Sequence, residues 1–145
     1  MTVFVIRNSH TSETIWQQLQ PALDMTAKIR LTSRIEDLRT ADTVLLLLTK
    51  GVLCGDSLEQ LQDTLRVDMD AQQDRIVAMY SETAGWLFGC EEQSRAPVEI
   101  QRCLQNHEAI TYRAPDPGGR HRHEFQAMVA HLVSQLRASG SPAHQ

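Results

Sequence analysis

Three stretches of consecutive apolar residues constrain the fold of this chain more than any other feature. They cover residues 3–6, 44–48 and 76–80, and their side chains do not alternate between apolar and polar. In a strand with one solvent-exposed face, apolar and polar residues alternate, whereas a parallel strand that is covered on both faces is a continuous apolar run. We therefore expect three buried parallel strands here, with two weaker runs, 28–32 and 109–113, as further strands of the same sheet.

Helical patterns lie between and after these strand candidates. Apolar residues recur at helical spacing over 12–24, 56–69, 97–106 and 123–137. Pro21 is expected to kink or end the first of these helices, and Ser57 with Gln60 has the form of a capping box at the start of the second. The connection 33–42 is short, with one helical turn expected around Ile35 and Leu38.

This alternation of strands and helices predicts an α/β fold. Right-handed crossovers most economically give a five-stranded parallel sheet in the flavodoxin-like order 2-1-3-4-5, a three-layer sandwich with helices on both faces. The 145 residues, 41% of them apolar, suit one domain over 1–138 followed by a flexible tail, 139–145. A single core of this size needs no metal or disulfide for its stability.

The charge balance argues against nucleic acid or an anionic membrane as a partner. The chain has 14 Lys and Arg against 18 Asp and Glu, a net charge of −4, and the basic residues are scattered. The densest basic stretch, Arg113 together with residues 120–123, has the composition of a solvated loop or of a local anion contact.

Cysteine usage and the first residues favour a cytoplasmic protein. The three cysteines, Cys54, Cys90 and Cys103, show neither the spacing of a zinc site nor a disulfide framework. The chain starts without the basic segment of a signal peptide, and its longest apolar run, 44–48, is too short to span a bilayer. We therefore expect a soluble protein in a reducing compartment, without a metal site.

The expected topology itself selects candidate site residues. In open parallel sheets, ligands bind beyond the carboxyl ends of the strands, at the switch point between strands 1 and 3 of this order. Polar residues follow both of these strands directly, and a carboxylate lies near the start of the next helix. The side chains selected in this way are Arg7, Asn8, Ser9, His10, Thr49, Lys50 and Glu59.

Each of these candidates also has an ordinary structural explanation. Asn, Ser and His are common loop and N-cap residues, and Glu59 would complement the dipole of its helix. Trp86 and Phe88, in a glycine-rich loop after residues 76–80, suit either stacking on a base or partner, or capping of the sheet edge.

Several familiar catalytic and nucleotide-binding motifs are absent from the sequence. Neither the P-loop nor the Gly-x-Gly-x-x-Gly dinucleotide motif occurs, and there is no Gly-x-Ser-x-Gly elbow. His123 and Glu124 lack the second histidine of a zincin, because position 127 is alanine. A phosphoacceptor receiver needs acidic residues where this chain has Arg7, Asn8, Thr49 and Lys50.

Residues 41–53, followed by a polar break and residues 57–61, resemble the strand C to helix C region of Toll/interleukin-1 receptor (TIR) domains. In that family, an apolar strand ending in Ser or Thr and a loop ending in leucine precede a helix that carries a glutamate. Residues 3–11 are similar to the family's first strand and polar loop, 76–80 to its strand D, and 123–137 to its last helix. The resemblance extends over residues 1–138.

The resemblance implies, as the leading function, a signalling domain that hydrolyses NAD, with a non-catalytic association module as the alternative. Some TIR domains are adaptors that associate with themselves or with other TIR domains, and others hydrolyse the nicotinamide–ribose bond of NAD, in signalling, as toxins or as defence effectors. For the second class it implies Glu59 as the catalytic carboxylate, with NAD as substrate and no further cofactor. A carboxylate stabilises the oxocarbenium-like charge that develops on the ribose. The implied substrate-binding residues are Arg7, Asn8, Ser9, Thr49, Lys50 and Trp86.

The chain departs from the family pattern at three places. Gly55, Asp56 and Ser57 stand where a tryptophan often precedes the glutamate, and Gln60 separates Glu59 from the leucine that usually follows it. The loop 33–42, which corresponds to the family's BB-loop, is short and lacks glycine and proline.

Overall fold

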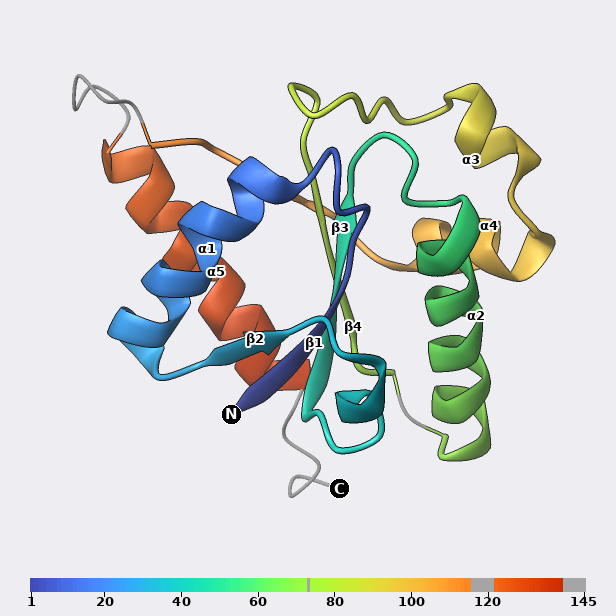
Figure 1. Ribbon diagram of the computed structural model, residues 1–145, viewed down its shortest axis with the longest axis horizontal. Helices are drawn as coiled ribbons and strands as arrows, with labels where there is room; N and C mark the ends of the chain where they lie inside the picture. The colour runs from blue at the N-terminus through green and yellow to red at the C-terminus, as the bar shows by residue number, and fades with distance from the viewer. Residues whose placement is uncertain (73, 116–121, 140–145) are drawn as a thin grey trace.

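The computed structural model describes residues 1–72, 74–115 and 122–139. Its centre is one parallel sheet, and its strands lie side by side in the order β2-β1-β3-β4-β5, as the sequence predicts (Figure 1). The strands are Thr2–Ile6 (β1), Arg30–Thr32 (β2), Thr43–Leu48 (β3), Ile76–Tyr80 (β4) and Ile110–Thr111 (β5).

Helices cover both faces of the sheet, which gives the expected three layers (Figure 1). Two long helices, α1 (Glu13–Ala27) and α5 (Arg122–Ser139), lie side by side on one face. The other face is covered by α2 (Gly55–Asp70) and α4 (Val98–Asn106). The chain also contains two short helical segments. They are a 3-10 turn, Ile35–Asp37, and a five-residue helix, α3 (Glu91–Arg95).

The continuous apolar runs are explained by two separate cores, one on each face of the sheet. Along β1, Val3 and Val5 contribute to the core under α1 and α5, while Phe4 and Ile6 contribute to the core under α2 and α4. All four side chains have no exposed surface. Because each of these four positions meets a helix layer, none of them is left for a polar residue.

Several local expectations differ from the structure. The first helix continues through Pro21 to Ala27, because Pro21 lies on the exposed side of α1, where water can reach the carbonyl that loses its N–H donor. The last strand is only Ile110–Thr111, and α3 was not expected.

The proposed capping box is also wrong. Ser57 is the third residue of α2, and its Oγ donates to the carbonyls of Val52 and Cys54 rather than capping the helix. Of the predicted tail 139–145, Ser139 is the last residue of α5, and 140–145 lie outside the described residues, as do Arg120 and His121 of the basic stretch.

A buried ion pair joins three elements at the amino end of the sheet. Arg75, just before β4, donates from Nε to Oδ1 of Asp68 on α2 over 2.8 Å, and its Nη1 donates to the carbonyl of Ala41 over 2.9 Å. The two charged side chains are 10% and 5% exposed. The guanidinium therefore fixes the end of α2 against the segments that enter β3 and β4.

None of the helices in the described parts of the chain combines the length and the apolar character needed to cross a membrane.

Candidate functional site at the carboxyl edge of the sheet

The strands are parallel, so the loops that follow β1, β3 and β4 meet at one edge of the sheet, at the top of Figure 1. We call this the carboxyl edge. Here Thr11 Oγ1 lies 2.8 Å from Thr49 Oγ1 and donates to the Lys50 carbonyl over 2.7 Å. Asn8 Oδ1 accepts from the backbone N–H groups of His10 and Thr11. The predicted candidates Asn8, Thr49 and Lys50 are thus brought together.

Gly51 fits closely against Asn8 at this edge. It has a φ of +87°, and a Cβ at this position would lie 2.6 Å from Asn8 Nδ2. Glycine is therefore required both by the backbone conformation and by the space. The loops after β1 and β3 are packed against each other where the switch-point crevice was expected.

Glu92 of α3 holds the other side of the same loop. Its carboxylate accepts from the backbone N–H of Gly51 over 2.8 Å and of Leu53 over 2.7 Å. Sequence reasoning missed this residue, because nothing in its own neighbourhood marks it and its partners lie about 40 positions away. Internal hydrogen bonds therefore satisfy much of the backbone that a ligand would meet here.

The loop after β4 joins this network. The Lys50 N–H donates to the Ala84 carbonyl over 3.0 Å, and Gly85, with a φ of +89°, lies against the Lys50 side chain. Lys50 itself is exposed.

Trp86 does not suit the substrate-binding role that was expected of it. Its side chain has no exposed surface, because it packs into the core under α2 and α4, with its ring 5.9 Å from that of Phe88. The indole anchors the loop, so that prediction is wrong for the observed conformation. Capping of the sheet edge, the alternative, describes Trp86 better.

Arg7 is bound to α1. Its Nη1 donates to Ser12 Oγ over 3.2 Å and to Glu13 Oε2 over 3.3 Å, and the guanidinium lies 4.5 Å from the centre of the Trp16 ring. The side chain is 14% exposed. Ser9, in contrast, is exposed.

Glu59 lies in the second turn of α2 and is exposed. Within the described parts of the chain, its carboxylate takes part in no hydrogen bond or ion pair, and nothing ties it to Asn8, Thr49 or Lys50. It is therefore available to a ligand, but the surrounding residues do not position it.

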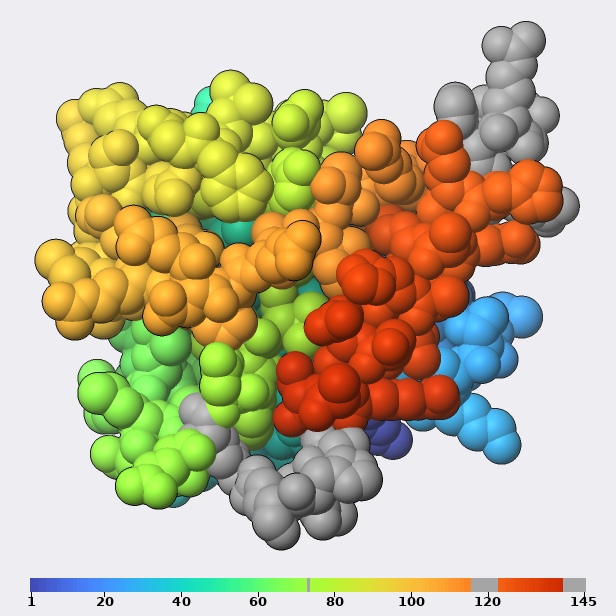
Figure 2. Space-filling view, turned by 180° about the vertical axis from the view of Figure 1, so that it is seen from behind, coloured from blue at the N-terminus to red at the C-terminus, as the bar shows by residue number. Residues whose placement is uncertain are grey.

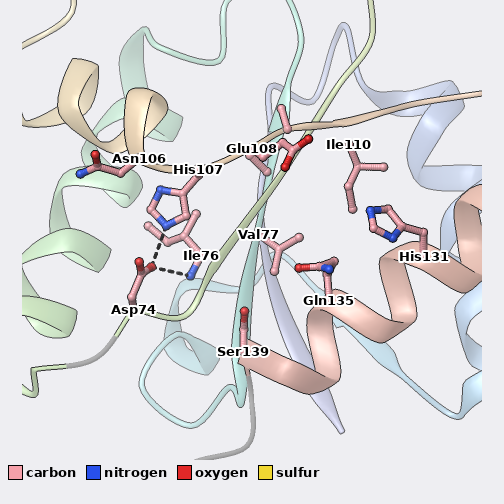
Figure 3. Close-up of a pocket in the computed structure, with 12 residues that line it drawn as sticks. Asp74, Ile76, Val77, Asn106, His107, Glu108, Ile110, His131, Gln135 and Ser139 are labelled. Carbon is pink, nitrogen blue, oxygen red and sulfur yellow. Dashed lines mark hydrogen bonds and ion pairs between the residues drawn. The ribbon is translucent and has the colours of Figure 1, made fainter.

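A second cluster of polar residues lies at the outer edge of β4. A hollow of about 280 Å³ opens below the two-residue β5, between the end of α4 and the end of α5. Figure 2 shows it from behind, between the orange segment and the red helix. In Figure 3, His107 and Asp74 form one side, and His131 and Gln135 of α5 form the other.

His107 is held by acceptors at both ring nitrogens. Nδ1 lies 2.7 Å from the Cys103 carbonyl and Nε2 lies 2.7 Å from Asp74 Oδ1, so both nitrogens carry a proton. The Cys103 side chain, 3.7 Å away, and then its carbonyl and Asp74 raise the pKa of His107 to about 10, against the opposing effect of burial. Because its Nδ1 is committed to the carbonyl and Cys103 is buried, the arrangement caps α4 and is not a Cys–His catalytic pair.

A larger groove runs between α1 and α5. It measures about 680 Å³ and is mainly apolar. Among the described residues, no group of three or more His, Cys, Asp or Glu is arranged to hold a metal ion.

No family model matches the chain, and no curated protein matches it significantly.

Proposed function

We propose that this chain is a TIR-like signalling domain that acts by associating with other copies or with other TIR domains. The observation that carries the proposal is a pair of apolar side chains held at the surface of the carboxyl edge. Leu87 is 61% exposed and Phe88 is 50% exposed. Adjacent, exposed, large apolar side chains are typical of sites that bind another protein.

The loop that carries these two side chains is fixed rather than loose. Gly85 and Gly89, with φ values of +89° and +83°, flank it, and the buried Trp86 anchors it. Gly89 N–H donates to Gln93 Oε1, and the ring of Phe88 packs edge-on against Tyr80 at 4.9 Å. A preorganised loop loses little conformational entropy on binding, which favours association.

Sedimentation equilibrium over a wide concentration range tests this proposal. We expect oligomers whose proportion rises with concentration and is unchanged in Glu59→Ala, since the exposed Glu59 carboxylate takes part in no hydrogen bond or ion pair in the described parts of the chain. A chain that stays monomeric at every concentration and binds no TIR domain would contradict the proposal.

Hydrolysis of the nicotinamide–ribose bond of NAD is a second proposal, favoured by the free carboxylate of Glu59 at the surface of α2. In this function, Glu59 would stabilise the developing oxocarbenium-like charge on the ribose. Arg7, Asn8, Ser9, Thr49 and Lys50 would contact the substrate, which requires the closed loops of the carboxyl edge to open. The loops that must open are those held by Thr11 and Glu92.

Nicotinamide release from NAD by the purified chain at high concentration tests this second proposal. If Glu59 is catalytic, Glu59→Ala abolishes turnover. Asp63→Ala, which removes another exposed carboxylate one turn further along α2, is the matched control and keeps the activity. Absence of turnover would leave association as the proposed function, and turnover that survives Glu59→Ala would rule out Glu59 as the catalytic carboxylate.

A further inference from the structure

The loop between β3 and α2 directs two backbone N–H groups at a single carboxylate. Glu92 of α3 accepts from the N–H of Gly51 with Oε1 over 2.8 Å and from the N–H of Leu53 with Oε2 over 2.7 Å. In Figure 1, α3 lies next to this loop at the top of the molecule. Backbone N–H groups that converge within a turn form a concavity that suits an anion.

The other N–H groups of this loop are satisfied without Glu92. Within residues 50–54, they donate to backbone carbonyls of the same loop and of the loop after β4. Only Gly51 and Leu53 depend on a side chain, and it comes from about 40 positions further along the chain. Two donors left without a partner would cost free energy, so this pair favours an acceptor that offers two oxygens.

A phosphoryl group meets the needs of these two donors. Like a carboxylate, it presents two oxygens to neighbouring N–H groups, and its larger charge strengthens each hydrogen bond. Lys50, immediately before Gly51, is exposed, and within the described parts of the chain its ammonium group takes part in no ion pair. Its flexible stem carries a point charge, which is how lysine commonly binds phosphate. A phosphate at this loop would therefore gain a cation as well as the two N–H groups.

The contact made by Glu92 is one that can be released. None of the five residues of α3 is buried, and the Glu92 side chain itself is only partly buried. Rotation of this one side chain frees both N–H groups without exposing the core. Because Glu92 belongs to the same chain, it competes at a high effective concentration, and a free anion should bind the unmodified protein weakly.

We propose that the N–H groups of Gly51 and Leu53, together with Lys50, form a binding site for the phosphoryl group of a ligand. Glu92 occupies this site as an internal substitute and keeps it closed until a phosphorylated ligand displaces it. The inference goes beyond both proposed functions, because it requires neither association of the chain nor turnover of NAD.

Binding of inorganic pyrophosphate in metal-free buffer, measured by calorimetry, tests this site. Glu92→Ala removes the internal competitor, so its affinity for pyrophosphate should exceed that of the unmodified chain at least tenfold. Glu91→Ala is the matched control, because it removes the same charge from the neighbouring residue, which pairs with Arg95 on its own helix. We expect no such gain in this control. Lys50→Gln, added to Glu92→Ala, should remove most of the gain.

Amide chemical shifts measured by NMR locate the bound anion. In Glu92→Ala, pyrophosphate should shift the amides of Gly51 and Leu53 most strongly, and the same concentration of acetate should shift them less. Glu92→Gln keeps the length of the side chain but leaves a single acceptor oxygen, so its affinity should lie between those of Glu92→Ala and the unmodified chain. It also serves as the second variant if circular dichroism shows that Glu92→Ala is unfolded.

The outcomes are separate from those of the proposed functions. If neither Glu92 variant binds pyrophosphate more tightly than the unmodified chain, or if the amides of Gly51 and Leu53 do not respond, the inference is overturned. Equal affinities for acetate and pyrophosphate would overturn the choice of a phosphoryl ligand. Association and nicotinamide release are measured independently, so neither result depends on them.

Discussion

His107 shows at the scale of one residue how a histidine is kept charged. Its two ring nitrogens face the Cys103 carbonyl and the Asp74 carboxylate, and its pKa is raised to about 10 from 6.5. A cation at the end of a helix also interacts favourably with the helix dipole. Because the pKa is raised on folding, this stabilisation is complete below about pH 6.5 and is lost as the pH rises through about 10.

His107→Gln should therefore lower the free energy of unfolding by about 1–2 kcal/mol near pH 6.5. The difference from the unmodified chain should disappear above about pH 10, where the imidazole has lost its charge. Urea denaturation across this pH range measures both effects. In Asp74→Asn, NMR titration should show a lower pKa for His107, and an unchanged pKa would show that the carboxylate has no part in the shift.

At the scale of elements, the Asp68–Arg75 pair holds α2 to the entry of β3 and β4. Removing one member leaves the other charge buried without its partner, which costs several kcal/mol. We expect Asp68→Ala to lower the free energy of unfolding by about 3–5 kcal/mol. The double variant Asp68→Leu with Arg75→Met should cost less than Asp68→Ala alone, since no charge is stranded. Urea denaturation measures these differences, and an equal or larger loss in the double variant would contradict this explanation.

Elements with a continuous or periodic apolar pattern could be predicted from the sequence. β4 has the expected bounds, Ile76–Tyr80, because both of its faces are covered and its pattern is local. α3 could not be predicted, because none of its five residues is buried and Glu92 anchors it to a distant loop. The end of α1 was misjudged, because the cost of Pro21 depends on which side of the helix faces water.

For the candidate site, the sequence predicts the edge of the sheet at which its residues lie, but not how those residues contact one another. Topology alone brings Asn8 and Thr49 to the same edge, because parallel strands end on one side of a sheet. Whether that edge is open or filled depends on contacts such as Thr11 to Lys50, which join residues far apart in the chain. The burial of Trp86 likewise depends on tertiary packing that its glycine-rich neighbourhood does not reveal.

At the scale of the whole molecule, stability is distributed unevenly across the sheet. β3 lies at its centre, pairs with strands on both sides and is buried along its whole length. β5 contributes two residues and pairs on one side only. Amides of β3 should therefore exchange with solvent only through global unfolding, at a cost of about 5–15 kcal/mol for a domain of this kind.

Native-state hydrogen exchange, followed by NMR, tests this distribution. Thr111 and Tyr112 should exchange through local opening at a much lower free energy than Leu45, Leu46 and Leu47. Equal protection in β5 and β3 would contradict the uneven distribution.

The two tryptophans lie in different layers of the fold. Trp16 packs partly buried against the core under α1 and α5, with Arg7 over its ring, and Trp86 is enclosed in the core under α2 and α4. Each indole is thus a built-in optical probe of one side of the sheet. Replacing either by phenylalanine would leave a chain whose fluorescence reports on a single layer, so that the two halves of the sandwich can be followed separately as they melt.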